Sequence, residues 1–329
     1  MKNMTKLTVQ DLPHLFTPIP DFPKPGILYW NSQDLTGVPG ALTLVTDLFA
    51  ERCASWSKKH GRTIDYIGGF DARGFIFGAA VAERLGIGFL QLRKKGKLPP
   101  PTVFVTYQKE YGLDELYLNE MDLAGKAVVL IDDLLATGGT AEAGCRLIEK
   151  LGGTVAAFMT VIELPFLNGR GAKLGNYPVY SVLSTIGNTL RADVSYCVDN
   201  IAETESGEFV MVKRLNNPPG FAFTGGHIDP HVSAQNTVMW EQLEETGLSI
   251  HESEFITTLC NDGRDPRGDK VSLLYRSRVF GTMNSGEPGK TEPCTASAAD
   301  WEKIPPDQFV FDARKVLDKY VLRKASKAA

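Results

Sequence analysis

The run VVLIDDLLATGGT, residues 128–140, brings together residue types that can bind a phosphorylated sugar. Its two carboxylates, Asp132 and Asp133, follow a short apolar stretch and suit the vicinal hydroxyls of a ribose, directly or through Mg²⁺. A turn follows whose backbone N–H groups and hydroxyls can surround an anion, and it consists of Ala136, Thr137, Gly138, Gly139 and Thr140. The run therefore predicts a site for one phosphate monoester beside a ribose.

The chain around this run alternates strand-like and helix-like segments, which predicts a mostly parallel sheet covered by helices. Buried strands are predicted by the apolar runs 64–70, 88–94, 126–134 and 155–164. Helices are predicted by the apolar spacing of 38–59, 74–86 and 140–152. A glycine turn after a strand is often only a turn. The paired acids before this one favour a binding site, because ligands of parallel sheets bind at the carboxyl ends of the strands.

Composition limits the classes of function. The chain has 329 residues, 43% of them hydrophobic, which is enough for two soluble domains, each with its own core. A formal net charge of −4 argues against a general nucleic-acid partner or a membrane surface, since either favours a basic excess. Five widely spaced cysteines favour free thiols over disulfides or a zinc site. With no signal-peptide core at the N-terminus, a cytoplasmic protein is expected.

The alternation stops near the polar segment 184–193, so we predict two domains, 1–185 and 186–329. The second domain is predicted to contain strands at 194–202, 208–215 and 270–280 and helices at 233–246 and 312–325. Residues 281–298 are predicted to be a loop because they are rich in Gly, Pro, Ser and Thr.

Four further segments accompany the run at 128–140, namely PDFPKPGILY (20–29), GGFDARGF (68–75), RKKGKLPPPT (93–102) and EYG (110–112). In order and spacing they resemble adenine phosphoribosyltransferases, which are type I phosphoribosyltransferases, over roughly residues 15 to 184. The resemblance implies a mostly parallel sheet flanked by helices with a hood above it. It also implies adenine and phosphoribosyl pyrophosphate (PRPP) as substrates, AMP and pyrophosphate as products, Mg²⁺ as cofactor, and a homodimer.

The same resemblance assigns the pyrophosphate end of the site. Asp71, Ala72 and Arg73 would form the pyrophosphate loop, where a cis peptide bond before a residue other than proline is expected, and Arg73 would hold the leaving group. Lys97 to Tyr111 would be a mobile hood, with Lys97 and Tyr111 among the PRPP-binding residues. Displacement of pyrophosphate from C1 of a ribose needs fixed phosphates, a neutralised leaving group and excluded water, so a closing flap is in keeping with the chemistry.

The base end of the site is also assigned by resemblance. Glu110 of the hood would protonate or hydrogen-bond adenine N7, and Leu134 would pack on the purine face. The backbone of Leu28, Tyr29 and Trp30 would read the purine edge. Trp30 stands where the family usually has Arg, and this departure makes base specificity a weaker prediction than PRPP binding.

A second group of acids lies in the predicted helix 233–246. Glu241, Glu244 and Glu245 have spacing i, i+3 and i+4, which predicts one shared helical face. Like charges in such a cluster repel unless a cation lies among them, and oxygen ligands suit Mg²⁺ or Mn²⁺. A solvated acidic surface is the common alternative for an isolated EQLEE.

The surrounding stretch GGHIDPHVSAQNTVMWEQLEETGL, residues 225–248, resembles the Nudix signature with gaps. Gly226 is present, Val232 stands at the first Glu position, and Trp240 stands at the Arg position. The resemblance implies an α/β/α sandwich with a mixed sheet, with Glu241 as a catalytic residue and metal ligand and Glu244 and Glu245 as metal ligands. The two gaps favour impaired or altered hydrolysis.

Two further segments, 261–275 and 296–317, resemble Nudix hydrolases of the ADP-ribose type. Arg264 and Arg267 would then contact a diphosphate or a terminal ribose, although both arginines could instead pair with neighbouring aspartates. The resemblance implies an ADP-ribose-like nucleoside diphosphate as ligand, cleaved to AMP and ribose 5-phosphate. The alternative is a catalytically inactive module that senses the ligand and regulates the transferase.

Overall fold

The computed structural model of the chain describes residues 7–22, 28–109, 112–260, 265, 268–284 and 289–322. The chain forms two compact units, Met1–Val194 and Ser195–Ala329. Their boundary lies later in the chain than the one predicted at residue 185. The reason is local: the segment after residue 186 turns back and adds one more strand to the first sheet.

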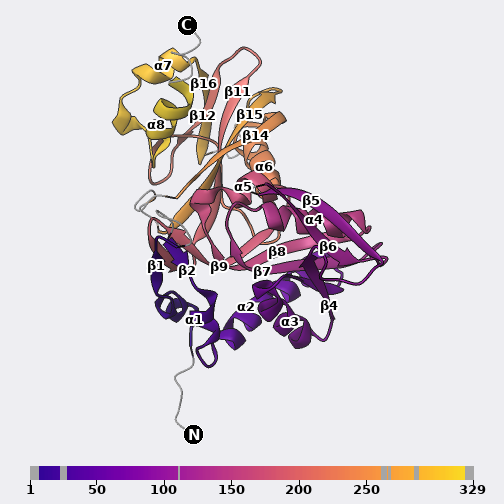
Figure 1. Ribbon diagram of the computed structural model, residues 1–329. Coiled ribbons are helices and arrows are strands. Elements are labelled where there is room, and N and C mark those ends of the chain that lie inside the picture. The colour runs from indigo at the N-terminus through magenta and orange to yellow at the C-terminus, as the bar shows by residue number, and fades with distance from the viewer. Residues whose placement is uncertain are drawn as a thin grey trace. The chain divides into compact units, whose positions relative to one another are not determined.

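The first unit is built on an eight-stranded sheet with the order β10-β9-β8-β7-β3-β4-β6-β5 (Figure 1). Its strands are β3 (Tyr66–Phe70), β4 (Gly88–Lys94), β5 (Thr102–Lys109), β6 (Gly112–Asn119), β7 (Ala127–Leu135), β8 (Thr154–Glu163), β9 (Val179–Ile186) and β10 (Thr189–Ala192). The five from β9 to β4 are parallel, whereas β10 and the β5–β6 hairpin are antiparallel to their neighbours. This confirms the predicted mostly parallel sheet.

Helices cover both faces of this sheet (Figure 1). The helices are α1 (Ser32–Thr36), α2 (Ala41–His60), α3 (Arg73–Leu85), α4 (Gly139–Lys150) and α5 (Gly169–Leu174), and 3₁₀ turns lie at Val9–Leu15 and Pro165–Leu167. On one face, α2 and α3 pack on the central strands, and on the other face α4 packs on them. Outside the sheet, β1 (Pro18–Pro20) pairs with β2 (Leu28–Trp30).

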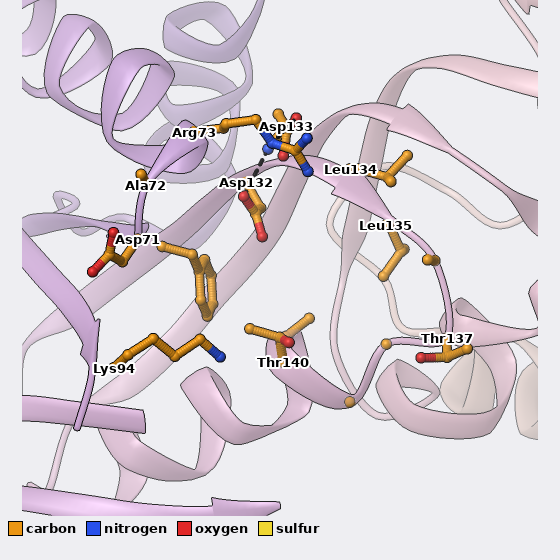
Figure 2. A pocket seen from close by; sticks show the side chains of 15 residues that line it. Asp71, Ala72, Arg73, Lys94, Asp132, Asp133, Leu134, Leu135, Thr137 and Thr140 are labelled. Carbon is orange, nitrogen blue, oxygen red and sulfur yellow. Dashed lines mark hydrogen bonds and ion pairs between the residues drawn. The ribbon is translucent and has the colours of Figure 1, made fainter. Parts of the chain in front are cut away.

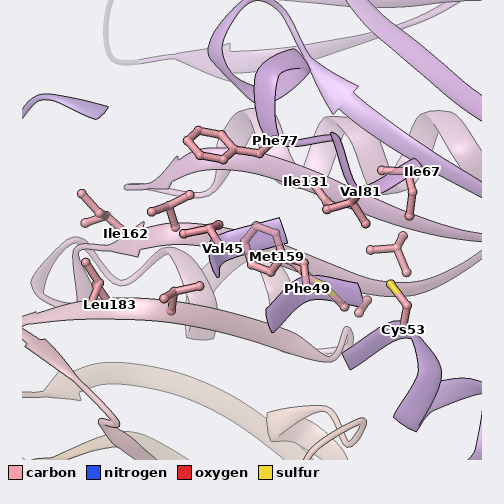
Figure 3. Packing of buried hydrophobic residues seen from close by; sticks show 14 of the residues in the cluster. Val45, Phe49, Cys53, Ile67, Phe77, Val81, Ile131, Met159, Ile162 and Leu183 are labelled. Atoms are coloured by element: carbon pink, nitrogen blue, oxygen red, sulfur yellow. The ribbon is translucent and has the colours of Figure 1, made fainter. Parts of the chain in front are cut away.

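Helix α2 shows why the apolar spacing predicted it. Val45, Phe49, Cys53 and Trp56 recur every three or four residues, so one side of the helix is buried. Figure 3 shows this side facing α3 and the apolar side chains of the parallel strands. The helix ends at Gly61, whose φ of 62° is a left-handed conformation that glycine adopts without cost. This packing fixes α3, and therefore its first residue, against the sheet.

The second unit has a mixed sheet, as predicted. Its strands are β11 (Ser195–Thr204), β12 (Phe209–Arg214), β13 (Gly220–Ala222), β14 (Ser249–Leu259), β15 (Lys270–Phe280) and β16 (Thr291–Ala296). Only β11 and β15 pair in parallel among the strands described there. One face packs against α6 (Ala234–Thr246), and the other packs against α7 (Ala298–Lys303), α8 (Ala313–Val316), a π-helical turn at Leu317–Leu322 and a 3₁₀ turn at Pro306–Gln308.

One prediction for this unit is wrong in part, and one strand was missed. Residues 291–296, predicted to lie in a loop, form β16, because they pair with β12 over their whole length despite Pro293. Strand β14 was not predicted, since its charged residues mask the alternation. In both cases pairing with a neighbouring strand outweighs local propensity. Among the described residues, no helix has both the length and the apolar character needed to span a bilayer.

Candidate functional site

A cavity of about 280 Å³ lies where β3 and β7 end in the first unit (Figure 2). It is lined by Phe70, Asp71, Ala72, Arg73, Lys94, Asp132, Asp133, Leu134, Leu135, Ala136, Thr137, Gly138, Gly139, Thr140 and Ala141. The structure therefore brings the predicted pyrophosphate loop, the two aspartates and the glycine turn to one place. These segments are far apart in the sequence, and the parallel pairing of β3 with β7 joins them.

Arg73 is the first residue of α3 and reaches two partners. Its Nε lies 2.8 Å from Asp133 Oδ2, and its Nη1 donates to the Tyr29 hydroxyl at 2.9 Å. About half of its side chain is exposed at the cavity. The turn before it contains the expected cis peptide bond, between Asp71 and Ala72. Gly74 allows the close approach of α3 to β7, since a Cβ there would lie 2.8 Å from the carbonyl oxygen of Ile131.

The two aspartates differ in their surroundings. Asp133 is almost fully buried and paired with Arg73. Burial and the neighbouring Asp133 carboxyl raise the pKa of Asp132 well above its ordinary value, while Arg73 opposes the rise. Asp132 Oδ1 accepts a hydrogen bond from the Asp133 backbone N–H at 2.9 Å. Two carboxylates at a cavity offer the oxygen ligands that Mg²⁺ takes together with substrate oxygens, so Asp132 and Asp133 fit such an ion.

The glycine turn leads from β7 into α4. Gly138 has a φ of 82°, which explains why glycine stands there. Helix α4 begins at Gly139, so its N-terminal N–H groups and positive dipole end face the cavity lined by Thr137 and Thr140. Such a terminus stabilises a phosphate.

A hydrogen-bonded group at the cavity was missed by the sequence reasoning. Lys94, at the end of β4, lines the cavity and donates to Asp114 Oδ2 at 2.6 Å and to the Tyr107 hydroxyl. The Tyr107 hydroxyl also lies 3.1 Å from Asp114 Oδ2, and Thr140 Oγ1 donates to it at 3.4 Å. The only signal in the sequence was that Lys94 ends a predicted strand, since its partners come from the β5–β6 hairpin.

The residues assigned to the base are less well gathered. Leu134 lines the cavity, but the described residues that line it do not include Leu28, Tyr29, Trp30 or Lys97. The side chain of Trp30 is buried in the hydrophobic core of the first unit, and its strand pairs with β1 at Pro18. The assigned role of the Leu28–Trp30 backbone at the purine edge stays a prediction.

The predicted hood is an antiparallel hairpin of β5 and β6 where the structure describes it. The hood residues Glu110 and Tyr111, between the two strands, lie outside the described residues. Their assigned roles therefore stay predictions.

In the second unit, α6 carries the three predicted carboxylates. The helix begins after Ser233, whose hydroxyl accepts the Asn236 N–H, and ends at Gly247. Glu245 is buried, and its Oε2 accepts the Gly225 backbone N–H at 3.0 Å. Glu241 packs against Gly226 so tightly that a Cβ there would lie 2.7 Å from its Oε2. A side chain on Gly226 would therefore displace the Glu241 carboxylate.

The three carboxylates lie at i, i+3 and i+4 of α6, which places them along one side of the helix. They differ in exposure, since Glu244 is exposed, Glu245 is buried and Glu241 is half-buried. Their assignment as metal ligands stays a prediction. In the described part of the chain, no three His, Cys, Asp or Glu side chains are placed to hold one metal ion. The described residues of this unit thus do not fit a three-carboxylate metal site.

The two gaps in the signature differ in environment. Val232 is buried, whereas Trp240 is 58% exposed. Sequence reasoning also missed Gln242, which follows Glu241 and is completely buried. Its side-chain oxygen accepts from Asn200 at 2.9 Å and from Thr224 at 2.6 Å. This buried polar group joins α6 to the sheet through hydrogen bonds with fixed geometry.

The arginines assigned to a diphosphate, Arg264 and Arg267, lie outside the described residues. Asp265 between them is buried and lies 3.3 Å from Lys270 Nζ. Asp265, one of the aspartates that Arg264 and Arg267 could have paired with, thus pairs with Lys270.

Comparisons with known proteins agree with this geometry. Residues 38–199 match the model of the phosphoribosyl transferase domain, and residues 195–323 match that of the NUDIX domain. An adenine phosphoribosyltransferase of Nitrosococcus oceani is 48% identical over 166 residues, which are 50% of this chain and 93% of the relative. The chain belongs to the adenine phosphoribosyltransferase family. It differs from these relatives in carrying a NUDIX domain after the transferase domain.

Further relatives cover the same half. The adenine phosphoribosyltransferase of Chloroflexus aurantiacus is 46% identical over 178 residues, 54% of this chain and 99% of the relative. The crystal structure of the Thermoanaerobacter pseudethanolicus enzyme matches with a TM-score of 0.50 and 40% identity, covering 54% of this chain and all of that one. The Saccharomyces cerevisiae enzyme, complexed with D-2,5-dideoxy-2,5-imino-altritol 1,6-bisphosphate and adenine, matches with a TM-score of 0.50 and 38% identity over 53% and 97%.

Proposed function

We propose that this chain transfers the 5-phosphoribosyl group of PRPP to adenine, which yields AMP and pyrophosphate. The observation that carries the proposal is the convergence of Arg73, the paired aspartates and the glycine turn on one cavity. The Saccharomyces cerevisiae relative, whose structure contains adenine and a sugar bisphosphate, supports the same substrate class.

Each group has a task in this reaction. The turn at 136–140 and the N-terminus of α4 would hold the 5-phosphate, and Asp132 and Asp133 would accept hydrogen bonds from the ribose hydroxyls. Positive charge develops at C1 as pyrophosphate leaves, so nearby carboxylates stabilise the transition state. Arg73 would neutralise the leaving group. Mg²⁺ bound by Asp132 and Asp133 would share that neutralisation.

The test uses the full chain with adenine, PRPP and Mg²⁺, and measures AMP and pyrophosphate in equal amounts. Hypoxanthine and guanine in place of adenine test whether Trp30, absent from the cavity lining, leaves the base preference intact. We expect adenine to be used and the other bases to react far more slowly. A chain that forms no AMP, while a curated relative does so under the same conditions, would refute the proposal.

For the NUDIX domain, we propose binding of an ADP-ribose-like nucleoside diphosphate with slow hydrolysis or none. Three observations support this: no three carboxylates among the described residues are placed to hold one metal ion, Val232 at the Glu position is buried, and Trp240 at the Arg position is exposed. Hydrolysis by the NUDIX domain remains the competing hypothesis. Binding would allow the domain to regulate the transferase.

ADP-ribose distinguishes the two hypotheses. The full chain is incubated with ADP-ribose and either Mg²⁺ or Mn²⁺, AMP is followed over time, and binding is measured by calorimetry. We expect saturable binding without appreciable AMP. Metal-dependent AMP formation that is lost in Glu241→Gln would establish hydrolysis instead.

The homodimer and the cytoplasmic location stay predictions. Sedimentation of the full chain tests the homodimer.

A further inference from the structure

Helix α5 lies directly against the back of the glycine turn in the transferase domain. A Cβ on Gly169, its first residue, would overlap the carbonyl oxygen of Ala136 and lie 2.9 Å from Gly138 N. Conversely, a Cβ on Gly138 would lie 2.8 Å from the Gly169 carbonyl oxygen. Two backbones therefore meet here with no side chain between them. Any displacement of Gly169 must move the turn that is proposed to bind the 5-phosphate.

The next residue, Arg170, is held by a buried set of hydrogen bonds. Its Nε lies 3.0 and 3.1 Å from the two carboxylate oxygens of Glu163, and its Nη2 also donates to Glu163. Its Nη1 donates to the Val179 carbonyl at 2.8 Å, and its Nη2 donates to Ser181 Oγ at 2.9 Å. Ser181 Oγ in turn donates to Glu163. Arg170 and Glu163 are 5% and 1% exposed, so both charges are removed from water.

These contacts fix the guanidinium in position and orientation. A guanidinium with donors directed to a carboxylate, a carbonyl and a hydroxyl cannot rotate without losing several hydrogen bonds. Its partners belong to β8 and β9, which are neighbouring parallel strands inside the sheet. The end of β8 is itself tied to the end of β7, because Leu164 N donates to the Leu135 carbonyl at 2.9 Å. The glycine turn is thereby supported where it leaves β7 and, through Gly169, at Ala136 and Gly138.

A purely stabilising role is the simpler alternative. It explains the pair poorly, since a buried ion pair often contributes no more to stability than apolar side chains of similar volume. It also leaves unexplained why Arg170 directly follows Gly169, the residue that touches the turn.

We propose that Arg170 and Glu163 are positioning residues, which hold Gly169 against Ala136 and Gly138 and thereby place the backbone N–H groups that bind the PRPP phosphate. The inference rests on the proposed transferase function. It requires no contact between either residue and the substrate.

The test separates position from stability with three variants of the full chain. Arg170→Met breaks the pair and leaves a buried carboxylate, so it is expected to lower the unfolding temperature strongly. Glu163→Leu with Arg170→Met replaces both charges by apolar groups and is expected to recover most of that temperature. Gly169→Ala keeps the pair and displaces the turn directly.

The readout is KM for PRPP against KM for adenine. In the double variant and in Gly169→Ala, KM for PRPP is expected to rise about tenfold or more, since loss of even one hydrogen bond to a charged phosphate weakens binding by about that factor. KM for adenine is expected to change less than about twofold, because the variants change none of the residues assigned to the base. Val161→Ala, in the core of the same strand β8, is the control for destabilisation alone.

A double variant with recovered stability and unchanged KM for PRPP would overturn the inference, as would an unchanged KM in Gly169→Ala. A rise in KM for PRPP equal to that in Val161→Ala would also overturn it. Failure of the transferase proposal looks different, because the unaltered chain would then form no AMP.

Discussion

Both halves of this chain place carboxylates beside a pair of glycines, yet the acids have different surroundings. In the transferase domain, Asp132 and Asp133 line a cavity, and Arg73 enters it from another element. In the NUDIX domain, Glu245 accepts the Gly225 N–H and Glu241 packs against Gly226. The acids of the first pair face a space that a ligand can enter. Two of the acids in the second set contact their own glycines.

This difference shows that similar residue patterns do not imply similar chemistry. A buried carboxylate that accepts a backbone N–H satisfies that N–H and orders the chain around it. When two carboxylates lie close together at a cavity, each disfavours the charged form of the other. Binding of a cation or a substrate donor favours the charged form again. Burial is the main cause of the raised pKa of Asp132, and the neighbouring Asp133 carboxyl adds to it. The following predictions test whether the two sites differ in this way.

The largest effect is expected for Arg73→Met. It removes a charge at the proposed position of the leaving group, so kcat/KM for PRPP should fall about 10²–10³-fold. Arg84→Met is the matched control, since Arg84 lies on the same helix and pairs with Asp47 on the surface. A steady-state assay of AMP formation measures both. Similar losses in the two variants would contradict the assigned role of Arg73.

Asp132→Asn should reduce activity and increase stability together. Loss of a charged acceptor for a ribose hydroxyl should lower kcat/KM about 10–100-fold, in keeping with about 1.5–3 kcal/mol for such a hydrogen bond. The neutral side chain should raise the unfolding temperature at pH 7 by about 2–4 °C, the shift expected for roughly 1 kcal/mol in a domain of this size.

The pH dependence of stability tests the cause of the higher unfolding temperature expected for Asp132→Asn. A carboxyl whose pKa is raised on folding holds its proton longer in the folded state. The stability of the unaltered chain should therefore fall as pH rises from the unfolded value near 3.8 toward the raised pKa of Asp132. Calorimetry at a series of pH values should show the gain of Asp132→Asn growing over that range. A gain that is equal at acid and neutral pH would exclude this cause.

In the NUDIX domain, replacement of two neighbouring acids should change the free energy of unfolding by very different amounts. Glu245→Leu leaves the Gly225 N–H without its acceptor and should cost about 1–3 kcal/mol of stability. Glu244→Leu removes an exposed acid and should change stability by less than about 0.5 kcal/mol. Calorimetric unfolding of the full chain compares the two. Equal effects would mean that Glu245 is no more structural than its neighbour.

The smallest effect is expected for Tyr29→Phe. Only the hydroxyl that accepts from Arg73 is lost, so KM for PRPP should rise about two- to fivefold, which corresponds to about 0.5–1 kcal/mol for a hydrogen bond. Tyr117→Phe is the control, because the Tyr117 hydroxyl binds Glu115 instead. An unchanged KM for PRPP would show that Asp133 alone orients Arg73.

The sequence predicted those parts of the molecule that depend on local pattern. Apolar runs predicted β3, β7 and α2, and the residue types at 132–140 predicted an anion site at the end of β7. Each rests on residues that are close together in the chain, where periodicity and turn chemistry act.

The remaining features depend on contacts between distant residues. Arg73 meets Tyr29 from 44 positions away, and Lys94 meets Asp114 across a hairpin. The burial of Trp30 and Gln242 follows from the packing of whole elements, which no local pattern records. Strand β16 likewise exists because β12 offers it a partner. Resemblance to a family supplied the functional roles, but it could not show that the three glutamates of α6 differ in burial.

The strand β10 has a practical consequence for anyone who wishes to separate the two halves. It lies at the edge of the first sheet and pairs with β9, and β11 begins only three residues after it ends, at Ser195. A fragment that stops at residue 185 would lack β10. The backbone N–H and C=O groups of β9 would then be unpaired at the sheet edge, which promotes aggregation. A fragment that starts at residue 186 would contain β10 without its partner β9. A cut between Val194 and Ser195 leaves both sheets whole.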